Sequence, residues 1–253
     1  MSKQKIALVT GGSRGLGKDM VMSLAKDGHD IIFTYHSNEK AAKEVQAAVH
    51  DLGQKAVILQ LDVADIKSFL SFKTQVSEAL SKYWDAMEFH SLVNNAGVGI
   101  HASFAETTEE QFDTLVNIHL KSTFFLTQAL LSLVADGGHI VNLSSGLARF
   151  CMPGYAAYGT MKGAVETLTK YMAKELGARK INVNVVAPGA IETDFGGGTV
   201  RDNKDVNALI ASQTALGRVG LPEDIGPVVA FLCSDAAHWI NAQRIEVSGG
   251  VVL

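Results

Sequence analysis

The stretch from Tyr155 to Ala164, YAAYGTMKGA, places two phenols and one ammonium on a short segment of mostly small residues. A tyrosine with an ordinary pKa of about 10 is a poor proton shuttle near neutrality, and a neighbouring ammonium stabilises its phenolate. Residues four apart share one face of a helix, which pairs Tyr158 with Lys162. Tyr155 lies seven residues from Lys162 and is better suited to packing or to a pocket wall. The segment therefore predicts that Tyr158 is a proton donor whose pKa is lowered by Lys162. The alternative is that the two are an ordinary pair on an amphipathic helix.

A glycine-rich turn, TGGSRGLG at Thr10–Gly17, joins the first apolar run to the first helical pattern. In such a turn Gly11 permits a sharp bend, Gly15 lets a pyrophosphate approach backbone N–H groups, and Gly17 permits close packing of helix on strand. The start of the helix adds unpaired donors and the positive end of a dipole. We therefore expect a dinucleotide here, although a tight strand-to-helix connection explains the glycines without a ligand. The expected contacts are Gly11, Ser13, Arg14, Gly15, Leu16 and Gly17.

The end of the second strand indicates which nicotinamide cofactor is used, because an acidic residue there would accept the adenosine ribose hydroxyls and repel a 2′-phosphate. No acidic residue stands at the positions that end this strand, Tyr35, His36 and Ser37. The Arg14 guanidinium can make a bidentate contact with phosphate oxygens; the alternative is that Arg14 is only a solvent-exposed charge in the loop. Together these features favour NADP(H) over NAD(H). Asp62, beside Val63, either accepts a hydrogen bond from the adenine amino group or serves the turn before the next helix.

Short apolar runs alternate with longer helical patterns along the whole chain. The expected strands span residues 6–9, 30–35, 56–61, 90–94, 139–144, 181–187 and 244–248. The expected helices span residues 16–27, 38–52, 66–82, 111–134, 155–177 and 223–234, the third capped by Asp65. Strands joined by helical crossovers predict an α/β fold with a doubly wound parallel sheet. We expect one domain over residues 1–253, with a glycine-rich excursion at 195–205 inside a substrate lid of about 190–215; a solvated loop is the alternative for the excursion.

The composition indicates a globular protein. Of 253 residues, 47% are hydrophobic and 19% charged, and a net charge of −4 gives no electrostatic reason to expect nucleic acid or an anionic membrane as partner. The apolar runs are too short to span a bilayer. The two cysteines, Cys151 and Cys233, make no metal framework, so we expect no metal, two free thiols and a cytoplasmic protein.

Ordered motifs across the chain resemble the short-chain dehydrogenase/reductase family from Lys5 to the C-terminus. They are TGGSRGLG, LDV at Leu61–Val63, NNAG at Asn94–Gly97, LSS at Leu143–Ser145, Tyr158 to Lys162, and PGAIET at Pro188–Thr193. The chain is similar to the branch that holds β-ketoacyl carrier-protein reductases and broad bacterial ketoreductases. The resemblance implies a Rossmann fold with a seven-stranded sheet and a Ser–Tyr–Lys catalytic group acting with NAD(P)(H).

The same resemblance assigns roles to individual residues. The family's serine falls on Ser145, thirteen residues before Tyr158, rather than on Ser144. Lys162 would also bind the nicotinamide ribose, and Thr193 the carboxamide. The remaining implied cofactor contacts are Asn95, Ala96, Gly97, Pro188, Gly189 and Ile191. The family also pairs its two long helices with copies from other subunits, which implies a homotetramer.

One position departs from the family pattern. The asparagine that usually completes the catalytic group is replaced by His119, counting without gaps from Asn94. Asn117, two residues earlier, should point about 200° away on a helix and should not substitute. Imidazole both donates and accepts hydrogen bonds, so His119 either holds a water of the proton path to Lys162 or simply packs beneath the site.

The leading hypothesis is an NADPH-dependent reductase, of class EC 1.1.1.-, that converts a ketone or 3-oxoacyl group to a secondary alcohol with Tyr158 as proton donor. The alternatives are an NAD-linked alcohol or sugar dehydrogenase and a catalytically silent dinucleotide-binding sensor. The substrate is expected to be a small carbonyl compound, with an acyl carrier protein thioester as a further possibility. The expected pocket lining is Gly99, Ile100, His101, the segment Leu147–Met152 and Phe195. Arg149 in that lining either meets an anion or is a surface charge.

Overall fold

A seven-stranded, wholly parallel sheet forms the centre of the molecule in a computed structural model that describes residues 4–253. The strands lie in the order β3-β2-β1-β4-β5-β6-β7. Their bounds are β1 Ile6–Val9, β2 Asp30–Tyr35, β3 Ala56–Gln60, β4 Phe89–Asn94, β5 Val134–Leu143, β6 Asn182–Pro188 and β7 Arg244–Val247. The predicted doubly wound α/β fold with seven strands is confirmed.

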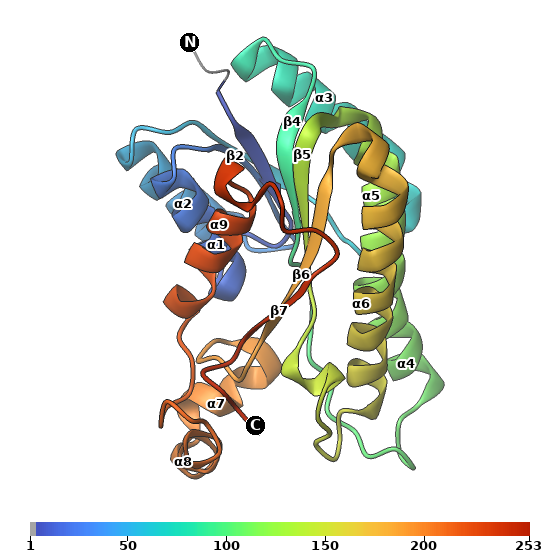
Figure 1. The fold of residues 1–253 in the computed structure, drawn as a ribbon, viewed down its shortest axis with the longest axis vertical. Coiled ribbons are helices and arrows are strands. Elements are labelled where there is room, and N and C mark those ends of the chain that lie inside the picture. The colour runs from blue at the N-terminus through green and yellow to red at the C-terminus, as the bar shows by residue number, and fades with distance from the viewer. Residues whose placement is uncertain (1–3) are drawn as a thin grey trace.

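Helices cover both faces of this sheet, which separates the core into two layers (Figure 1). On one side lie α1 (Gly15–Lys26), α2 (Glu39–Asp51) and α9 (Gly226–Leu232), and on the other lie α3 (Phe69–Trp84), α5 (Ser122–Leu130) and α6 (Ala156–Leu176). Along β1, Ala7 and Val9 pack in the first layer while Ile6 and Leu8 pack in the second. Side chains that alternate across a strand, with both faces buried, account for its uniformly apolar sequence.

The strand order reverses at β1, which pairs with β2 on one side and with β4 on the other. In open parallel sheets such a switch point opens a crevice beyond the carboxyl ends of the strands, where ligands bind. The glycine turn follows β1 and the NNAG segment follows β4. Figure 1 shows α7 (Thr199–Asp202) and α8 (Lys204–Ser212) beyond the same ends of β6 and β7.

The long helix expected at residues 111–134 is interrupted and ends early. Helix α4 (Glu109–Leu115) starts at a capping box formed by Thr108 and Gln111, and a π-helical turn, Val116–Lys121, separates it from α5. A 3-10 turn, Leu131–Leu133, follows, and Val134 already belongs to β5, opposite Phe89. At this end of the segment, residues with helical periodicity form a strand instead, because pairing with a buried neighbouring strand is more favourable than continuing the helix.

The excursion at residues 195–205 is not a plain solvated loop, because it contains the 3-10 turn Phe195–Gly198 and all of α7. Asn203 then caps α8 by accepting hydrogen bonds from the backbone of Asp205 and Val206. Two other expected helices begin late because short 3-10 turns precede them: α3 at Phe69, after the turn that Asp65 caps, and α9 at Gly226. Within residues 4–253 no helix combines the length and the apolar character needed to cross a bilayer.

Candidate active site

The glycine turn presents backbone donors to the crevice. Gly11 and Gly15 have φ values of +69° and +53°, in the left-handed region that side chains disfavour. A Cβ at Gly17 would lie 2.1 Å from the Gly11 carbonyl oxygen, so α1 can only pass this close to the turn without a side chain. Arg14 occupies the N-cap of α1 and makes no side-chain cap. The first N–H groups of α1 are thus available to an anion.

The NNAG segment is fastened to this turn by polar contacts. The Asn95 side chain donates to the carbonyl oxygens of Thr10 and Gly11, at 2.8 and 3.2 Å. In return, Thr10 Oγ1 accepts from the backbone N–H groups of Asn95 and Ala96, each at 3.0 Å. One wall of the crevice is therefore rigid and joins the ends of β1 and β4.

Helix α6 brings Tyr158 and Lys162 to the carboxyl end of β5. Both side chains are buried, and Lys162 Nζ lies 5.5 Å from the centre of the Tyr158 ring. Lys162 Nζ donates to the Leu143 carbonyl oxygen at 2.8 Å. The Ser145 side chain lies close enough to Tyr158 to lower its pKa, whereas Ser144 donates to Glu166 at 2.6 Å. The structure thus groups Ser145, Tyr158 and Lys162 and directs Ser144 elsewhere.

Burial governs the proton affinities of this group. It lowers the pKa of Lys162 to about 7, because an ammonium loses its hydration inside the protein. Burial also raises the pKa of Tyr158, and the nearby Ser145 side chain opposes this rise only in part. The pKa of Tyr158 is therefore not lowered in the protein alone, contrary to what the sequence leads us to expect. Loss of hydration of the phenolate outweighs the effect of Lys162, which is itself only partly charged near neutrality.

His119 lies in the π-helical turn, fully enclosed. Its Nε2 is 2.8 Å from the Val98 carbonyl oxygen, and its ring meets the Tyr158 ring edge-on with centres 5.3 Å apart. A Cβ at Gly97 would come within 2.8 Å of the imidazole Cε1, so Gly97 makes room for the larger ring. Burial and the nearby Lys162 lower the pKa of His119 to about 3, which keeps it neutral. An Nε2–H tautomer satisfies Val98 and leaves the buried Nδ1 as an acceptor without a hydrogen-bond partner in the protein.

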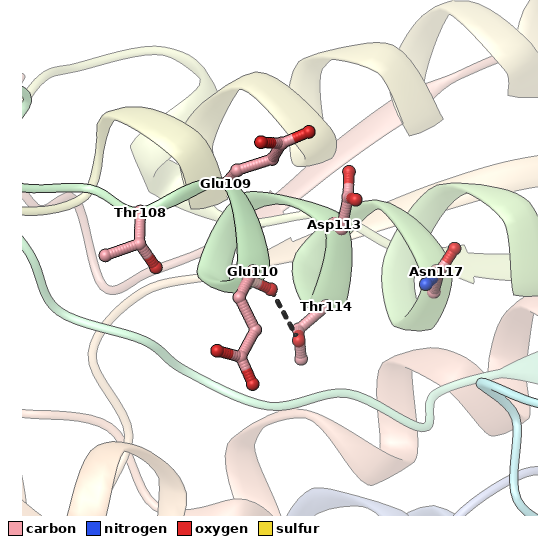
Figure 2. Close-up of a pocket in the computed structure, with 6 residues that line it drawn as sticks. All are labelled: Thr108, Glu109, Glu110, Asp113, Thr114 and Asn117. Atoms are coloured by element: carbon pink, nitrogen blue, oxygen red, sulfur yellow. Dashed lines mark hydrogen bonds between the residues drawn. The ribbon is translucent and has the colours of Figure 1, made fainter.

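Asn117 faces away from this group. Figure 2 shows its side chain on the π-helical turn that follows α4, beside a shallow groove. The groove is lined by Thr108, Glu109, Glu110, Asp113, Thr114 and Asn117. Asn117 therefore does not take the place of the missing asparagine. The part of the chain that the structure describes has no group of three or more His, Cys, Asp or Glu side chains arranged to hold a metal ion.

The chain matches the family model described as enoyl-(acyl carrier protein) reductase over residues 11–252. It belongs to the short-chain dehydrogenase/reductase family. It is 35% identical to a hydroxynaphthalene reductase-like protein Arp2 of Metarhizium brunneum, covering 98% of this chain and 95% of the relative.

Two solved structures are closely similar. The promiscuous reductase LugOII, which catalyses keto-reduction at C1 in lugdunomycin biosynthesis, superposes with a TM-score of 0.93 at 35% identity, over 100% of this chain and 99% of its own. The angucycline C-6 ketoreductase LanV, with bound NADP, gives a TM-score of 0.93 at 34% identity, over 98% and 95%. This short-chain dehydrogenase/reductase is accordingly an NAD(P)-dependent oxidoreductase acting on carbonyl or CH–OH groups.

The second strand of this short-chain dehydrogenase/reductase ends in an exposed segment. His36 and Ser37 are exposed and Tyr35 is half-buried. Asp62 accepts a hydrogen bond from the Ala64 backbone at 2.9 Å, which is turn chemistry, and its other oxygen lies 3.9 Å from His36 Nε2. The neighbouring Val63 packs against the core.

The segment after β6 returns to the glycine turn. Pro188 ends β6, the Gly189 backbone donates to Val247, and Ile191 pairs with Gly220. The Thr193 side chain lies 3.7 Å from the position of a Cβ on Gly15, so the two face each other across the crevice. Thr193 Oγ1 accepts from the Phe195 backbone at 3.2 Å, which fixes the start of the excursion.

Sequence reasoning missed three groups that hold this site. Asp194 accepts hydrogen bonds from both Arg14 and Arg201, which joins the glycine turn to α7. An acid directly after Thr193, near the expected lid, was the one signal available. The carbonyl oxygens of Val98 and Leu143, which hold His119 and Lys162, leave no trace in the sequence because every residue carries one.

Arg149 is a structural residue of this short-chain dehydrogenase/reductase. Its guanidinium makes a bidentate contact with Glu246, at 2.7 and 2.8 Å, and donates to the carbonyl oxygens of Val251 and Val252, each at 2.8 Å. It therefore ties the segment after Ser145 to the C-terminal residues. These partners use the donors that Arg149 would need to bind a substrate anion, so the structure favours the second alternative, a surface charge.

Proposed function

We propose that this protein is an NADPH-dependent reductase that converts a small-molecule ketone to a secondary alcohol, with Tyr158 as the proton donor. The observation that supports it most is the placement of Ser145 beside buried Tyr158, with buried Lys162 one helical turn further on. Burying a lysine is unfavourable, so a tyrosine–lysine pair with a purely structural role would not be expected to exclude its ammonium from solvent. Carbonyl reductases of the family provide the reaction class.

The crevice fits a dinucleotide. The free donors at the start of α1 suit a pyrophosphate, and Lys162, which has three N–H donors and gives one to Leu143, suits ribose hydroxyls. When bound, the nicotinamide supplies the hydride. The further residues proposed to contact the cofactor are Gly11, Ser13, Arg14, Gly15, Leu16, Gly17, Tyr35, His36, Ser37, Asp62, Val63, Asn95, Ala96, Gly97, Pro188, Gly189, Ile191 and Thr193.

NADP(H) is the proposed cofactor rather than NAD(H). The exposed end of β2 carries no acidic residue to repel a 2′-phosphate, and Arg14 remains well exposed despite its 3.5 Å contact with Asp194. A single exposed ion pair of this length contributes little, so it competes weakly with a phosphate. LanV, a close structural neighbour, was crystallised with NADP.

The chain's own residues would act as follows. Ser145 and Tyr158 hydrogen-bond the carbonyl oxygen and so fix its position. Tyr158 passes its phenolic proton to that oxygen as the alcohol forms. A charged Lys162 stabilises the phenolate left behind, and the positive ring of the oxidised nicotinamide adds to this. His119, neutral and bonded to Val98, offers Nδ1 to a water on the path that returns a proton through Lys162. The alternative for His119 is packing alone.

We further propose one domain over the chain with a lid at about residues 190–215, assembled as a homotetramer in the cytoplasm; residues 1–3 lie outside the described part. Large apolar side chains are exposed on α4, α5 and α6, namely Phe112, Phe124, Phe125 and Tyr171. A Cβ on Gly163 of α6 would meet nothing within 4 Å, which leaves room for a neighbouring helix. Sedimentation velocity should therefore give a species about four times the chain mass.

The experiment that tests the function follows NADPH absorbance against a panel of small ketones, ketosugars and carrier-protein thioesters. Wild-type protein should consume NADPH with at least one ketone, and Tyr158→Phe should bind NADPH normally but lose turnover by about 10³-fold or more. Turnover retained in folded Tyr158→Phe protein would refute the mechanism. Tight NADPH binding with no turnover would favour the sensor, and a higher kcat/KM with NADH would favour the NAD-linked dehydrogenase.

A further inference from the structure

The ring of Phe195 lies directly beside the catalytic phenol. Its centre is 5.7 Å from that of the Tyr158 ring. Gly99 also contacts this ring, because a Cβ there would come within 2.7 and 2.9 Å of two Phe195 ring carbons. The ring therefore lies on bare backbone at Gly99 and against a ring at Tyr158. We call the space that this ring fills, bordered by Gly99 and Tyr158, the Gly99–Tyr158 slot; it holds one aromatic ring.

The surroundings of the slot are also aromatic. The Tyr155 and Tyr158 rings have centres 6.4 Å apart and meet edge-to-face, and His101 packs against Tyr155 at 5.1 Å in the same manner. Edge-to-face and offset arrangements are those that aromatic pairs prefer, and each adds attraction beyond the area it buries. A substrate that contacts these rings is therefore favoured if it carries a flat aromatic ring of its own.

Charge in the lining points the same way. Arg149, the cation of the segment Leu147–Met152, makes two hydrogen bonds with Glu246 and two with carbonyl oxygens near the C-terminus. Moving it onto a substrate anion would strip Glu246 of its bidentate partner. A substrate carboxylate or phosphate would therefore have to compete with Glu246 for Arg149, whereas a neutral substrate would not.

Phe195 can leave the slot without disturbing the core. It is 43% exposed, and three glycines follow it with φ of +61°, +75° and +79°. A Cβ on Gly196 or Gly197 would meet nothing within 4 Å, so these two residues lie in open space; their backbone makes two local hydrogen bonds, from Gly197 N–H to the Asp194 carbonyl oxygen and from Thr199 Oγ1 to the Gly196 carbonyl oxygen. Consecutive glycines in the left-handed region can change φ and ψ at low cost, which suits a hinge.

We propose that the substrate is a neutral, planar aromatic ketone, and that its ring occupies the Gly99–Tyr158 slot after Phe195 has swung outward to cover it. This rests on the reductase function proposed above and adds the substrate class to it. Phe195 and Gly99 are then specificity-determining residues: one supplies a stacking partner and the other the width of the slot.

A matched pair of ketones tests the proposal. 2-Tetralone and 2-decalone share a fused two-ring carbon skeleton, but only the first has an aromatic ring; acetoacetyl-CoA supplies an anionic 3-oxoacyl compound. Wild-type kcat/KM should be about tenfold or more higher for 2-tetralone than for 2-decalone, and acetoacetyl-CoA should be the poorest of the three. Phe195→Leu should lower the value for 2-tetralone about three- to tenfold and that for 2-decalone less than about twofold. Phe231→Leu, a half-exposed phenylalanine on α9, is the matched control and should change neither.

Equal wild-type values for the two ketones, or an equal loss on both in Phe195→Leu, would overturn the proposal. Calorimetry with 2-naphthol in the presence of NADP⁺ examines the slot without turnover. Binding that weakens in Gly99→Ala and Phe195→Leu, but not in Phe231→Leu, supports the slot even if no ketone is reduced, in which case only the reductase function fails. Absence of 2-naphthol binding to wild-type protein that binds NADP⁺ refutes the slot itself.

Discussion

Replacing Lys162 with methionine should make the protein more stable while it abolishes activity. Burial lowers the pKa of Lys162 from 10.5 to about 7, so holding this ammonium inside the folded protein is unfavourable. A shift of this size corresponds to about 5 kcal/mol at roughly 1.4 kcal/mol per unit. The Leu143 carbonyl oxygen loses its donor in the variant, which costs about 1–3 kcal/mol. The net gain at pH 7 should therefore be about 2–3 kcal/mol.

The pH dependence of this gain is specific. Because the folded pKa lies below the unfolded one, the penalty in wild-type protein is fully present below pH 7 and disappears as pH rises through 7 towards 10.5. The difference in unfolding free energy between variant and wild type should thus be constant below about pH 6 and shrink by about 2–3 kcal/mol between pH 7 and 9.

Urea unfolding at pH 6, 7 and 9 measures this difference. Lys170→Met, which removes an exposed lysine two turns further along α6, is the matched control and should show a difference near zero at every pH. A Lys162→Met protein less stable than wild type at pH 7, or a difference that does not change between pH 7 and 9, would refute the argument from burial.

Three further predictions concern the cofactor crevice and the opposite end of the sheet. Gly17→Ala, whose Cβ would lie 2.1 Å from the Gly11 carbonyl oxygen, should weaken NADPH binding at least about tenfold by fluorescence titration, whereas Gly177→Ala, in open space, should not. Arg14→Ala should raise the Kd for NADPH about tenfold and that for NADH less than about twofold; equal effects would remove Arg14 from 2′-phosphate recognition. Burial lowers the pKa of His139 to about 4, so the neutral ring contributes stability that is present above pH 6.5 and lost, by about 3 kcal/mol, as pH falls to 4. His139→Gln should flatten that part of the pH–stability curve, and a parallel curve for the variant would contradict it.

Local structure was predicted correctly where it depends on residues close in sequence. The spacing of Tyr158 and Lys162 fixes their common face on α6, and the glycines of Thr10–Gly17 fix a turn that side chains would block. Alternating apolar runs and helical patterns were sufficient for a seven-stranded parallel sheet. These features are encoded over a few residues, so periodicity and steric rules predict them.

Contacts between distant segments could not be predicted in this way. The end of α5 was misplaced because Val134 pairs with Phe89, and no local pattern announces that partner. The seating of His119 depends on a carbonyl oxygen at Val98 and on space at Gly97, both contributed by another segment.

The sequence by itself predicted the fold class, the glycine turn and the shared helix face of Tyr158 and Lys162, because each follows from short-range spacing. Only the tertiary structure decided that burial raises the proton affinity of Tyr158 and lowers that of Lys162, that Arg149 is committed to Glu246, and that Phe195 fills a slot at Gly99. Desolvation and ring packing depend on which distant segments surround a group in space, and that arrangement exists only once the chain has folded.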